Sequence, residues 1–461
     1  MTNPNLEQNP KSDRIAAFIT GFDLAATPAE LIDLAEIAFV DTIGVILAGS
    51  GEPAARIVCD MVAAEGAAPV AGIVGRALRT SPQNAALANG IATQALDFDL
   101  TFASGQSAAA LIPGLLPLAQ TIDARPEDLI ASYIVGCEVC ARVVRSFPGL
   151  SGEGGWHGAG VAGVITAAAG YAKLTGMSAA HIPAAIGISA SMASGLGENF
   201  GTMVKPLHAG LAARSGITAV NLAARGFTAS ATAIEGKQGF LASYARGLTW
   251  DAAPFDDLGE RFNLLDPGYM IKPFACGGLL HTAIEAALHF RDQVQPRLGQ
   301  IKSIAIGATQ HAANRVIDAY PWSEDSSRFS LKYLIPYALI HGAPGIDAFS
   351  DAAIDDDAVR ALSPCVTAAV DDEFADVSVS GLSPSRLTIT FNDGDRLEHV
   401  VWIARGSKDM PMSEDAIKQK FHACATRAIG AAAASDLYDY LRNLRNQADL
   451  RDLWPLLVTD D

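Results

Sequence analysis

The chain has 461 residues, half of them hydrophobic and 18% charged, and a formal net charge of −17 at pH 7. This length exceeds what one hydrophobic core usually supports, so we expect two domains and exclude a single small module. The negative charge, with no concentrated basic face, excludes a nucleic-acid-binding protein, because neutralising phosphates requires clustered lysine and arginine side chains.

The sequence predicts neither a membrane span nor a secretory signal. The longest apolar stretches, such as residues 159–172, are rich in Gly and Ala and too short to cross a bilayer. Residues 1–14 are polar and lack the basic head and hydrophobic run of a signal peptide. We therefore expect a cytoplasmic protein with no membrane partner.

Six cysteines are too few for a disulfide scaffold in a chain of this length. Cys137 and Cys140 have the C-x-x-C spacing, but they lie in the apolar, helix-like segment 129–144. Neither a second pair nor a nearby histidine completes a zinc site. The pattern favours two buried helix positions, and we expect no bound metal.

The first 290 residues show helical periodicity almost throughout, with Ala-rich faces separated by Gly and Pro. So many small residues favour a closely packed helical bundle over a flexible chain. The predicted helices cover residues 27–48, 81–97, 106–122, 127–146, 156–176, 179–195, 207–226 and 277–290.

The pattern changes near residue 300. Residues 301–307 and 386–391 alternate like strands, and the turn Asn-Asp-Gly-Asp at 392–395 predicts a hairpin into 396–403. A helix is predicted over 329–341, and Ser413 is a helix N-cap for a segment reaching about 446. We therefore predict a mainly α protein: a large all-helical domain of residues 1–270 and 406–461, with a smaller α+β domain of 271–405 inserted into it.

The motifs of the common cofactor enzymes are missing from the sequence. There is no phosphate-binding loop, no dinucleotide glycine fingerprint following a strand, no H-E-x-x-H, no calcium loop and no nucleophile elbow. We therefore expect no cofactor. Catalysis by side chains alone suits proton transfer next to a carboxylate, with cations holding an anionic substrate.

Side chains suited to that chemistry occur in five places. Each has a structural alternative when taken alone: a helix cap for Asp, a satisfied core donor for His, a surface charge for Lys, packing for Tyr. The Lys-Pro pair, however, occurs twice in Gly-rich surroundings, and we expect Lys205 to precede a helix whose N-terminus attracts anions. The five places are Asp97-Phe98-Asp99-Leu100-Thr101, His157 among glycines, Lys205 to His208, Lys272 to Cys276 with His281 beyond it, and Lys332-Tyr333.

At these residues the chain resembles the MmgE/PrpD family, which includes 2-methylcitrate dehydratase, cis-aconitate decarboxylase and iminodisuccinate epimerase. The resemblance covers nearly the whole chain, and KPLHAG at 205–210 is its most specific part. The other matching segments are 39–44, 88–90, 95–99, 201–204, 235–240, 271–276, 329–333 and 406–421.

The resemblance implies a homodimer and a positively charged, cofactor-free cleft between the two domains. It also assigns a site. The implied catalytic residues are His157, Tyr333, Asp97 and Lys272, with His157 and Tyr333 as candidates to move protons. The resemblance implies that Lys205 and Lys272 bind carboxylates and gives Thr101 a role in the site. We add Gln106, Cys276 and His208 as substrate-binding candidates, with His208 the weaker because it lies inside the helix.

Three departures from the family pattern bear on the reaction. Gln94 stands where members often have His, and Gln106 lies where lyases of the family carry a His-Pro. Glutamine cannot shuttle a proton near neutral pH. Gly277 lies where decarboxylase-like members place a His, which makes cis-aconitate decarboxylation the least favoured of the three activities.

Three functions follow. The first is a lyase that dehydrates a hydroxylated di- or tricarboxylate, as 2-methylcitrate dehydratase does. The second is an epimerase or isomerase that removes and returns a proton next to a carboxylate, which needs no acid for a leaving group. The third is an inactive binding or scaffold protein, which explains the departures but not the retained Lys205, His157, Lys272 and Tyr333.

Overall fold

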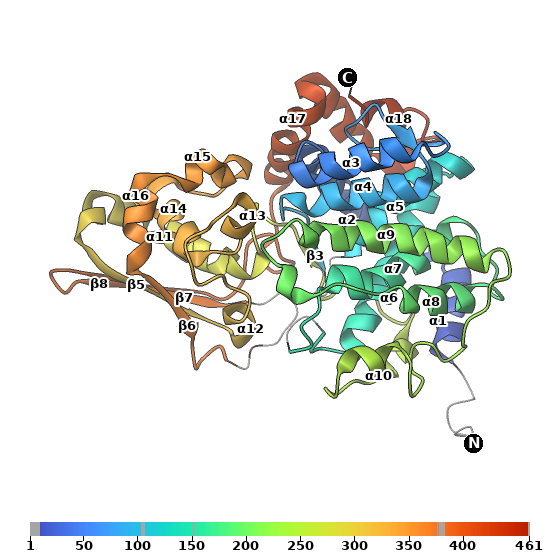
Figure 1. Ribbon diagram of the computed structural model, residues 1–461, viewed down its shortest axis with the longest axis horizontal. Coiled ribbons are helices and arrows are strands. Elements are labelled where there is room, and N and C mark those ends of the chain that lie inside the picture. Colours follow the sequence, from blue (N-terminus) through green and yellow to red (C-terminus); the bar gives the residue numbers. More distant parts are fainter. Residues whose placement is uncertain (1–9, 103–106, 151–152, 376, 378–382, 460–461) are drawn as a thin grey trace.

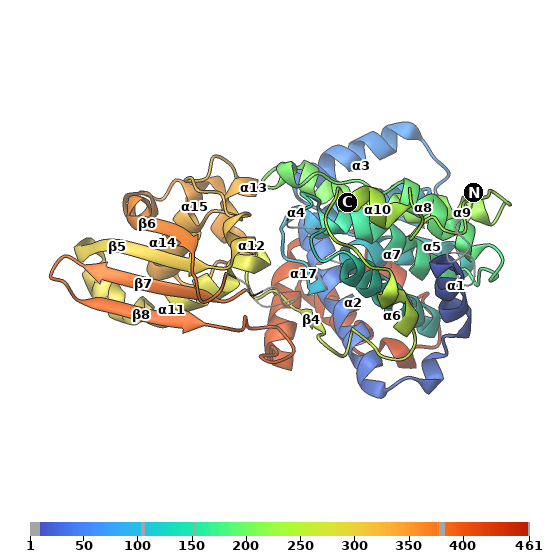
Figure 2. The same cartoon turned by 90° about the horizontal axis from the view of Figure 1, so that it is seen from below.

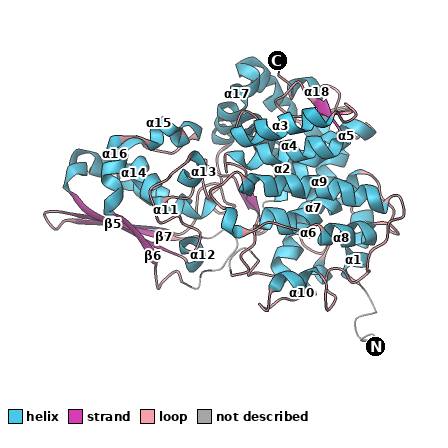
Figure 3. Cartoon of the chain, viewed as in Figure 1, coloured by secondary structure: helices cyan, strands magenta, loops and turns pink. Residues whose placement is uncertain are grey.

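The computed structural model describes residues 10–102, 107–150, 153–375, 377 and 383–459. A large helical body and a smaller lobe stand side by side in two perpendicular views (Figures 1 and 2). Strands gather mainly in the smaller lobe, while helices dominate the rest of the chain (Figure 3). The predicted mainly α fold is thus confirmed. No helix in the described part of the chain is both long and apolar enough to cross a membrane.

The helical body contains an observed helix for each segment predicted before residue 227. Two further helices before residue 227, α1 and α3, were not predicted, and neither were the short helices α10 and α18. The helices of the body are α1 (Lys11–Gly21), α2 (Ala29–Gly49), α3 (Pro53–Glu65), α4 (Pro82–Ala95), α5 (Ser107–Ile122), α6 (Pro126–Ser146), α7 (Gly158–Leu174), α8 (Ile182–Ser191), α9 (Val204–Ala223), α10 (Phe240–Ala245), α17 (Glu414–Leu441) and α18 (Leu453–Leu456). Short strands pair as β1 (Ala71–Gly72) with β2 (Arg79–Thr80), and β3 (Thr101–Phe102) with β4 (Tyr269–Met270).

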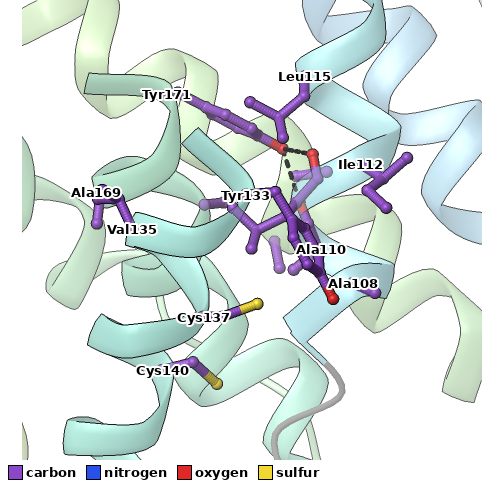
Figure 4. Packing of buried hydrophobic residues seen from close by; sticks show 14 of the residues in the cluster. Ala108, Ala110, Ile112, Leu115, Tyr133, Val135, Cys137, Cys140, Ala169 and Tyr171 are labelled. Carbon is purple, nitrogen blue, oxygen red and sulfur yellow. Dashed lines mark hydrogen bonds between the residues drawn. The ribbon is translucent and has the colours of Figure 1, made fainter. Parts of the chain in front are cut away.

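Helix α7 runs through the middle of this body. Every residue of α7 except Lys173 is buried, as expected for a helix that is apolar all round. Figure 4 shows how it is tied to α5: the Tyr171 hydroxyl donates hydrogen bonds to the carbonyls of Ala110 and Leu111, at 2.6 and 3.2 Å. Tyr171 is therefore fixed in position by polar contacts as well as by packing.

The C-x-x-C pair of α6 lies in the same core (Figure 4). Both thiols are buried and free, and burial raises the pKa of Cys140 to about 12 and that of Cys137 further still. Thiols of this kind are poor metal ligands and poor nucleophiles at neutral pH, because the thiolate is the reactive form. The prediction of two buried helix positions is confirmed.

The smaller lobe is a four-stranded sheet with helices packed on it. The sheet has the order β6-β5-β7-β8, with β5 and β6 parallel and the other pairs antiparallel. Helices α11 and α14 pack against the sheet, on its upper side in Figure 1. The elements are α11 (His281–Val294), β5 (Ile301–Ala308), α12 (Gln310–Ala313), α13 (Glu324–Ser327), α14 (Leu331–His341), α15 (Asp351–Ile354), α16 (Asp357–Leu362), β6 (Val366–Val370), β7 (Ser385–Phe391) and β8 (Arg396–Val401).

The predicted hairpin is β7 and β8, paired from Ser385↔Val401 to Thr390↔Arg396. Leu387, Ile389 and Phe391 alternate inward on β7, which is the period-2 pattern that allowed its prediction. Strand β6 was not predicted, because only its first residue is buried and its sequence does not alternate.

The chain returns to the helical body after β8. Helix α17 packs against α2 (Figure 1), and Phe421 and Ala425 of α17 belong to the core of the body. Where the chain leaves and re-enters the body, the Ile271 N–H donates to the Gly406 carbonyl at 2.9 Å. On this arrangement we propose that residues 1–270 and 406–461 form one domain and that 271–405 form the inserted one.

A contact between two glycines sets the spacing of α4 and α9. A Cβ on Gly90 would lie 2.6 Å from the Gly210 Cα, and a Cβ on Gly210 would lie 2.5 Å from the Leu87 carbonyl oxygen. Both distances are shorter than atoms tolerate, so only glycine permits this approach. Since α4 ends just before Asp97 and α9 begins beside Lys205, the contact brings those two residues within reach of each other.

Candidate functional site

Asp97 lies at the centre of the candidate site, just after α4. Its φ of 48° is in the left-handed region, which aspartate tolerates better than most residues. One carboxylate oxygen, Oδ1, lies 2.6 Å from the Lys272 ammonium and 3.0 Å from that of Lys205. Lys272 also donates to the Asp97 carbonyl at 2.8 Å. We call these three buried residues the Asp97–lysine cluster.

The cluster is charged. Burial alone would raise the pKa of Asp97, but Lys205 and Lys272 hold it well below its usual range. Burial would lower the pKa of Lys272, but Asp97 and Asp99 raise it. Burial raises the pKa of the nearby Asp99 carboxyl, which favours its uncharged form, so two ammonium groups face one carboxylate in surroundings that screen charge poorly. That combination favours binding of an anion.

Several polar atoms of this region lack a hydrogen-bond partner within the described part of the chain. They are Oδ2 of Asp97, Oδ1 of Asp99 and Nζ of Lys205, whose described polar contact is the ion pair with Asp97. Lys205 also faces the rings of Phe200 and Phe329, at 5.8 and 5.6 Å from their centroids. Buried polar groups are normally satisfied, so this arrangement leaves Lys205 able to donate hydrogen bonds to a ligand.

Lys205 and His208 are placed together by α9. Helix α9 begins at Val204, so Lys205 is its second residue; the expectation that Lys205 precedes the helix was wrong by two positions. Pro206 is accommodated because amides of the first turn have no partner within the helix. Lys205 and His208 are three residues apart and therefore lie on the same helix face.

His208 forms a pair with His157, the N-cap residue of α7. Their Nδ1 atoms are 3.0 Å apart, so the Nδ1–H of one ring donates a hydrogen bond to the Nδ1 of the other. Burial, followed by the charge of Lys205, lowers both pKa values, that of His208 to about 4 and that of His157 well below its usual range. Both imidazoles are therefore neutral at pH 7 and able to accept a proton.

Thr101 and Cys276 flank Lys272. Thr101 lies on β3, in register with Met270 of β4. Burial raises the pKa of the Cys276 thiol, which remains protonated. His281 lies beyond them, 3.3 Å from the Cys276 carbonyl, and burial, with Lys272 second, lowers its pKa to about 3. Gln106 lies outside the described residues.

Tyr333 lies in a hydrophobic cluster that fills the smaller lobe and extends to Leu96 and Phe98, on either side of Asp97. Its hydroxyl donates to the Ala348 carbonyl, and its ring packs against Tyr320, Tyr337 and Phe349. Burial raises the pKa of Tyr333 far above neutrality. This hydroxyl is already engaged and resists ionisation. The proton-transfer role expected for Tyr333 stays a prediction.

Two cations missed in the sequence hold the loop that carries Asp97. Arg328 donates to the carbonyls of Leu96 and Ala275, at 3.0 and 2.9 Å. Lys420 of α17 donates to the Phe98 carbonyl at 2.8 Å and forms an ion pair with Asp41 of α2.

Asp41 in turn accepts from the Leu100 N–H at 3.2 Å. Asp41 and Lys420 both lie in segments that carry the family resemblance, which is the signal that could have found them. Arg328 had no comparable motif, since it precedes the matching segment by one residue.

No group of three or more His, Cys, Asp and Glu side chains that could hold a metal ion occurs among the residues that the structure describes.

Comparison with known proteins gives matches along most of the chain. A family model of the MmgE/PrpD N-terminal domain matches residues 13–253, and one of the MmgE/PrpD C-terminal domain matches residues 274–445.

Three relatives indicate the kind of chemistry found among similar proteins. A cis-aconitate decarboxylase-like protein of Aspergillus oryzae is 26% identical, covering 95% of this chain and 95% of its own. The cis-aconitate decarboxylase of Homo sapiens is 25% identical, covering 82% and 80%, and that of Aspergillus terreus is 24% identical, covering 99% and 98%. Decarboxylases of this kind are carbon–carbon lyases acting on a small carboxylate. The two family matches span both parts of the chain, which therefore belongs to the MmgE/PrpD family.

Proposed function

We propose that the protein is a cofactor-independent lyase that dehydrates a small hydroxylated di- or tricarboxylate. The observation that carries this proposal is the Asp97–lysine cluster: a buried, net positive group with unused hydrogen-bonding capacity, adjoining a neutral histidine pair. Lyase activity among the relatives supports the reaction class.

Lys205 and Lys272 have different roles in this proposal. Lys272 is fully buried and donates to both the side chain and the carbonyl of Asp97, so it fixes the aspartate in place. Lys205 is held by the same carboxylate but retains N–H groups without acceptors among the described residues. Lys205 is therefore the residue that binds a substrate carboxylate, by charge-assisted hydrogen bonds.

His157 is the proposed base. In the tautomer in which its Nδ1–H donates to His208, Nε2 carries the lone pair that accepts a proton from the carbon next to the carboxylate. The electron pair left on that carbon spreads into the carboxylate, where Lys205 stabilises it, and then expels the hydroxyl group, which takes the proton back from protonated His157 and leaves as water.

A second candidate function is epimerisation, and one contact favours it. Gln94, in a position where the family often has histidine, is buried and donates to Asp99 at 3.2 Å. An amide there cannot supply a proton to a leaving group. An epimerase needs a second group that returns the proton to the opposite face of the same carbon, but it needs no acid for a leaving group, so the loss of this histidine is compatible with epimerisation.

A deuterium-exchange assay separates the candidates. The purified protein is incubated in D2O with citrate, 2-methylcitrate, cis-aconitate and iminodisuccinate, and products are followed by NMR. Loss of water with alkene formation supports the dehydratase. Deuterium incorporation without net water loss supports the epimerase, and release of CO2 from cis-aconitate supports a decarboxylase.

The same assay includes two variants. Lys205→Ala should lose the activity, whereas Lys418→Ala, which removes an exposed lysine of α17, should retain it. If the protein showed no turnover and no deuterium exchange with any of the four compounds, the proposal would be overturned.

A further inference from the structure

Arg315 is a half-buried cation between α12 and α13 that the sequence analysis did not single out. Its guanidinium lies 4.6 Å from the centroid of the Phe200 ring, and its Nη2 donates to the Trp156 carbonyl at 3.4 Å. It forms no ion pair with any acidic side chain that the structure describes. We propose that Arg315 binds a terminal carboxylate of the substrate, distal to the carboxylate held by Lys205; this rests on the proposed function.

The Phe200 ring connects Arg315 to the site. Lys205 lies 5.8 Å from the same ring centroid, and the His157 ring meets it edge-on at 5.0 Å. Three side chains therefore surround the Phe200 ring: His157, the proposed base; Lys205, proposed to bind a substrate carboxylate; and Arg315. Arg315 comes from the inserted segment, whereas Phe200 and Trp156 belong to the helical body, so a ligand held by Arg315 and Lys205 would bridge the two.

Arg315 differs from Arg386 and Arg442, which are partly buried and ion-paired, and from Arg328, which has no ion pair among the described residues but donates to two backbone carbonyls at 3.0 and 2.9 Å. Arg386 is paired with Asp371 at 2.8 Å, and Arg442 with Glu414 at 2.7 Å. Shielding a cation from water without a counterion is unfavourable. Such an arrangement is typical of a site whose counterion arrives with the ligand.

The charges indicate the class of ligand. The Asp97–lysine cluster carries one net positive charge, and Arg315 adds another, which also lowers the pKa of His157. A single carboxylate would leave one of these charges uncompensated. Because guanidinium binds carboxylates through a planar fork of N–H groups, the arrangement suits a substrate with separated carboxylates, as in a tricarboxylate.

Binding of two inert anions tests this assignment. Tricarballylate has three carboxylates, and methylsuccinate is the same molecule with one terminal carboxylate replaced by hydrogen. Dissociation constants for both are measured by calorimetry with the native protein, with Arg315→Gln, and with Arg225→Gln, which removes an exposed arginine after α9. The four values for native and Arg315→Gln protein form a cycle that isolates the contact between the guanidinium and the terminal carboxylate.

The native protein should bind tricarballylate more tightly than methylsuccinate. Arg315→Gln should weaken tricarballylate binding roughly 10- to 100-fold while changing methylsuccinate binding less than about threefold. Arg315→Lys should restore part of the preference, and Arg225→Gln should match the native protein.

Two results would overturn the inference while leaving the proposed function intact. One is a native preference for tricarballylate that survives in Arg315→Gln. The other is an equal loss of affinity for both anions, which would mean that Arg315 acts through long-range electrostatics and does not contact the terminal carboxylate. If the native protein bound neither anion and turned over none of the four compounds above, the proposed function would fail, and the inference with it.

Discussion

Two buried ionic groups of this protein differ in how completely they are satisfied. In the first, Arg142 of α6 uses all five of its N–H donors, on the side chains of Glu138, Asp257 and Asn263 and on the carbonyls of Asp257 and Arg261. Both Glu138 oxygens also accept backbone N–H groups. In the Asp97–lysine cluster, by contrast, Oδ2 of Asp97 and Nζ of Lys205 have no hydrogen-bond partner among the described residues.

The difference distinguishes an ionic group that only stabilises the fold from one that can bind a ligand. A fully satisfied network has no capacity left for a ligand, and its function is to tie α6 to the segment around residue 260. A cluster with unused donors carries an unfavourable free energy that a bound anion can relieve. Both groups place buried cations beside carboxylates, so the hydrogen-bond count is what identifies the site.

The largest expected effect is on stability, from Arg142→Ala. This change leaves the Glu138 carboxylate buried without its cation, and breaking such a pair costs about 3–5 kcal/mol. The free energy of unfolding should fall by that amount in urea titrations, while turnover per folded molecule stays near the native value. The exposed Arg225→Ala variant is the control. A loss below about 1 kcal/mol for Arg142→Ala would contradict a structural role for the Arg142 network.

The next effect is on activity, from Lys205→Met, which keeps most of the side-chain volume. Loss of one electrostatic contact to developing charge should lower kcat/KM by about 10²- to 10³-fold. The unfolding free energy should change little, because Asp97 keeps Lys272 as a partner. A large loss of stability with unchanged kcat/KM would instead place Lys205 with Arg142 as a structural residue.

The smallest effect is a dependence of stability on pH. His208, with a folded pKa of about 4, and His281, with one of about 3, both titrate near 6.5 in the unfolded chain. Between pH 6.5 and pH 4 the unfolded chain therefore binds more protons, and the free energy of unfolding falls as the pH drops.

His208 alone should lower the free energy of unfolding by about 2–3 kcal/mol across that window. His208→Asn should have a shallower slope than the native protein, whereas His181→Asn, at an exposed position, should keep the native slope. Parallel slopes for all three proteins would show that the histidine pair is not held neutral by burial.

Sequence reasoning succeeded where a residue's role depends on its own neighbours in the chain. The helices α2 and α4 to α9 follow from apolar periodicity, and the β7–β8 hairpin follows from alternation around an Asn-Asp-Gly turn. Strand β6 does not alternate, and it pairs in parallel with a strand that lies 58 or more positions away in the sequence. No local sequence pattern therefore predicts it. The homodimer and the cytoplasmic location stay predictions.

The sequence by itself determined the helical class, the strands of the sheet segment, the family, and the residue types available for chemistry, because periodicity and motif spacing are properties of the chain. Tertiary structure alone decided which of those residues meet. It joined Lys205 and Lys272 on one oxygen of Asp97, paired His157 with His208, and brought Arg315 to Phe200. It also packed the Tyr333 ring against Tyr320, Tyr337 and Phe349. These contacts link residues from 51 to 175 positions apart, and only the packing of helices and lobes fixes such distances.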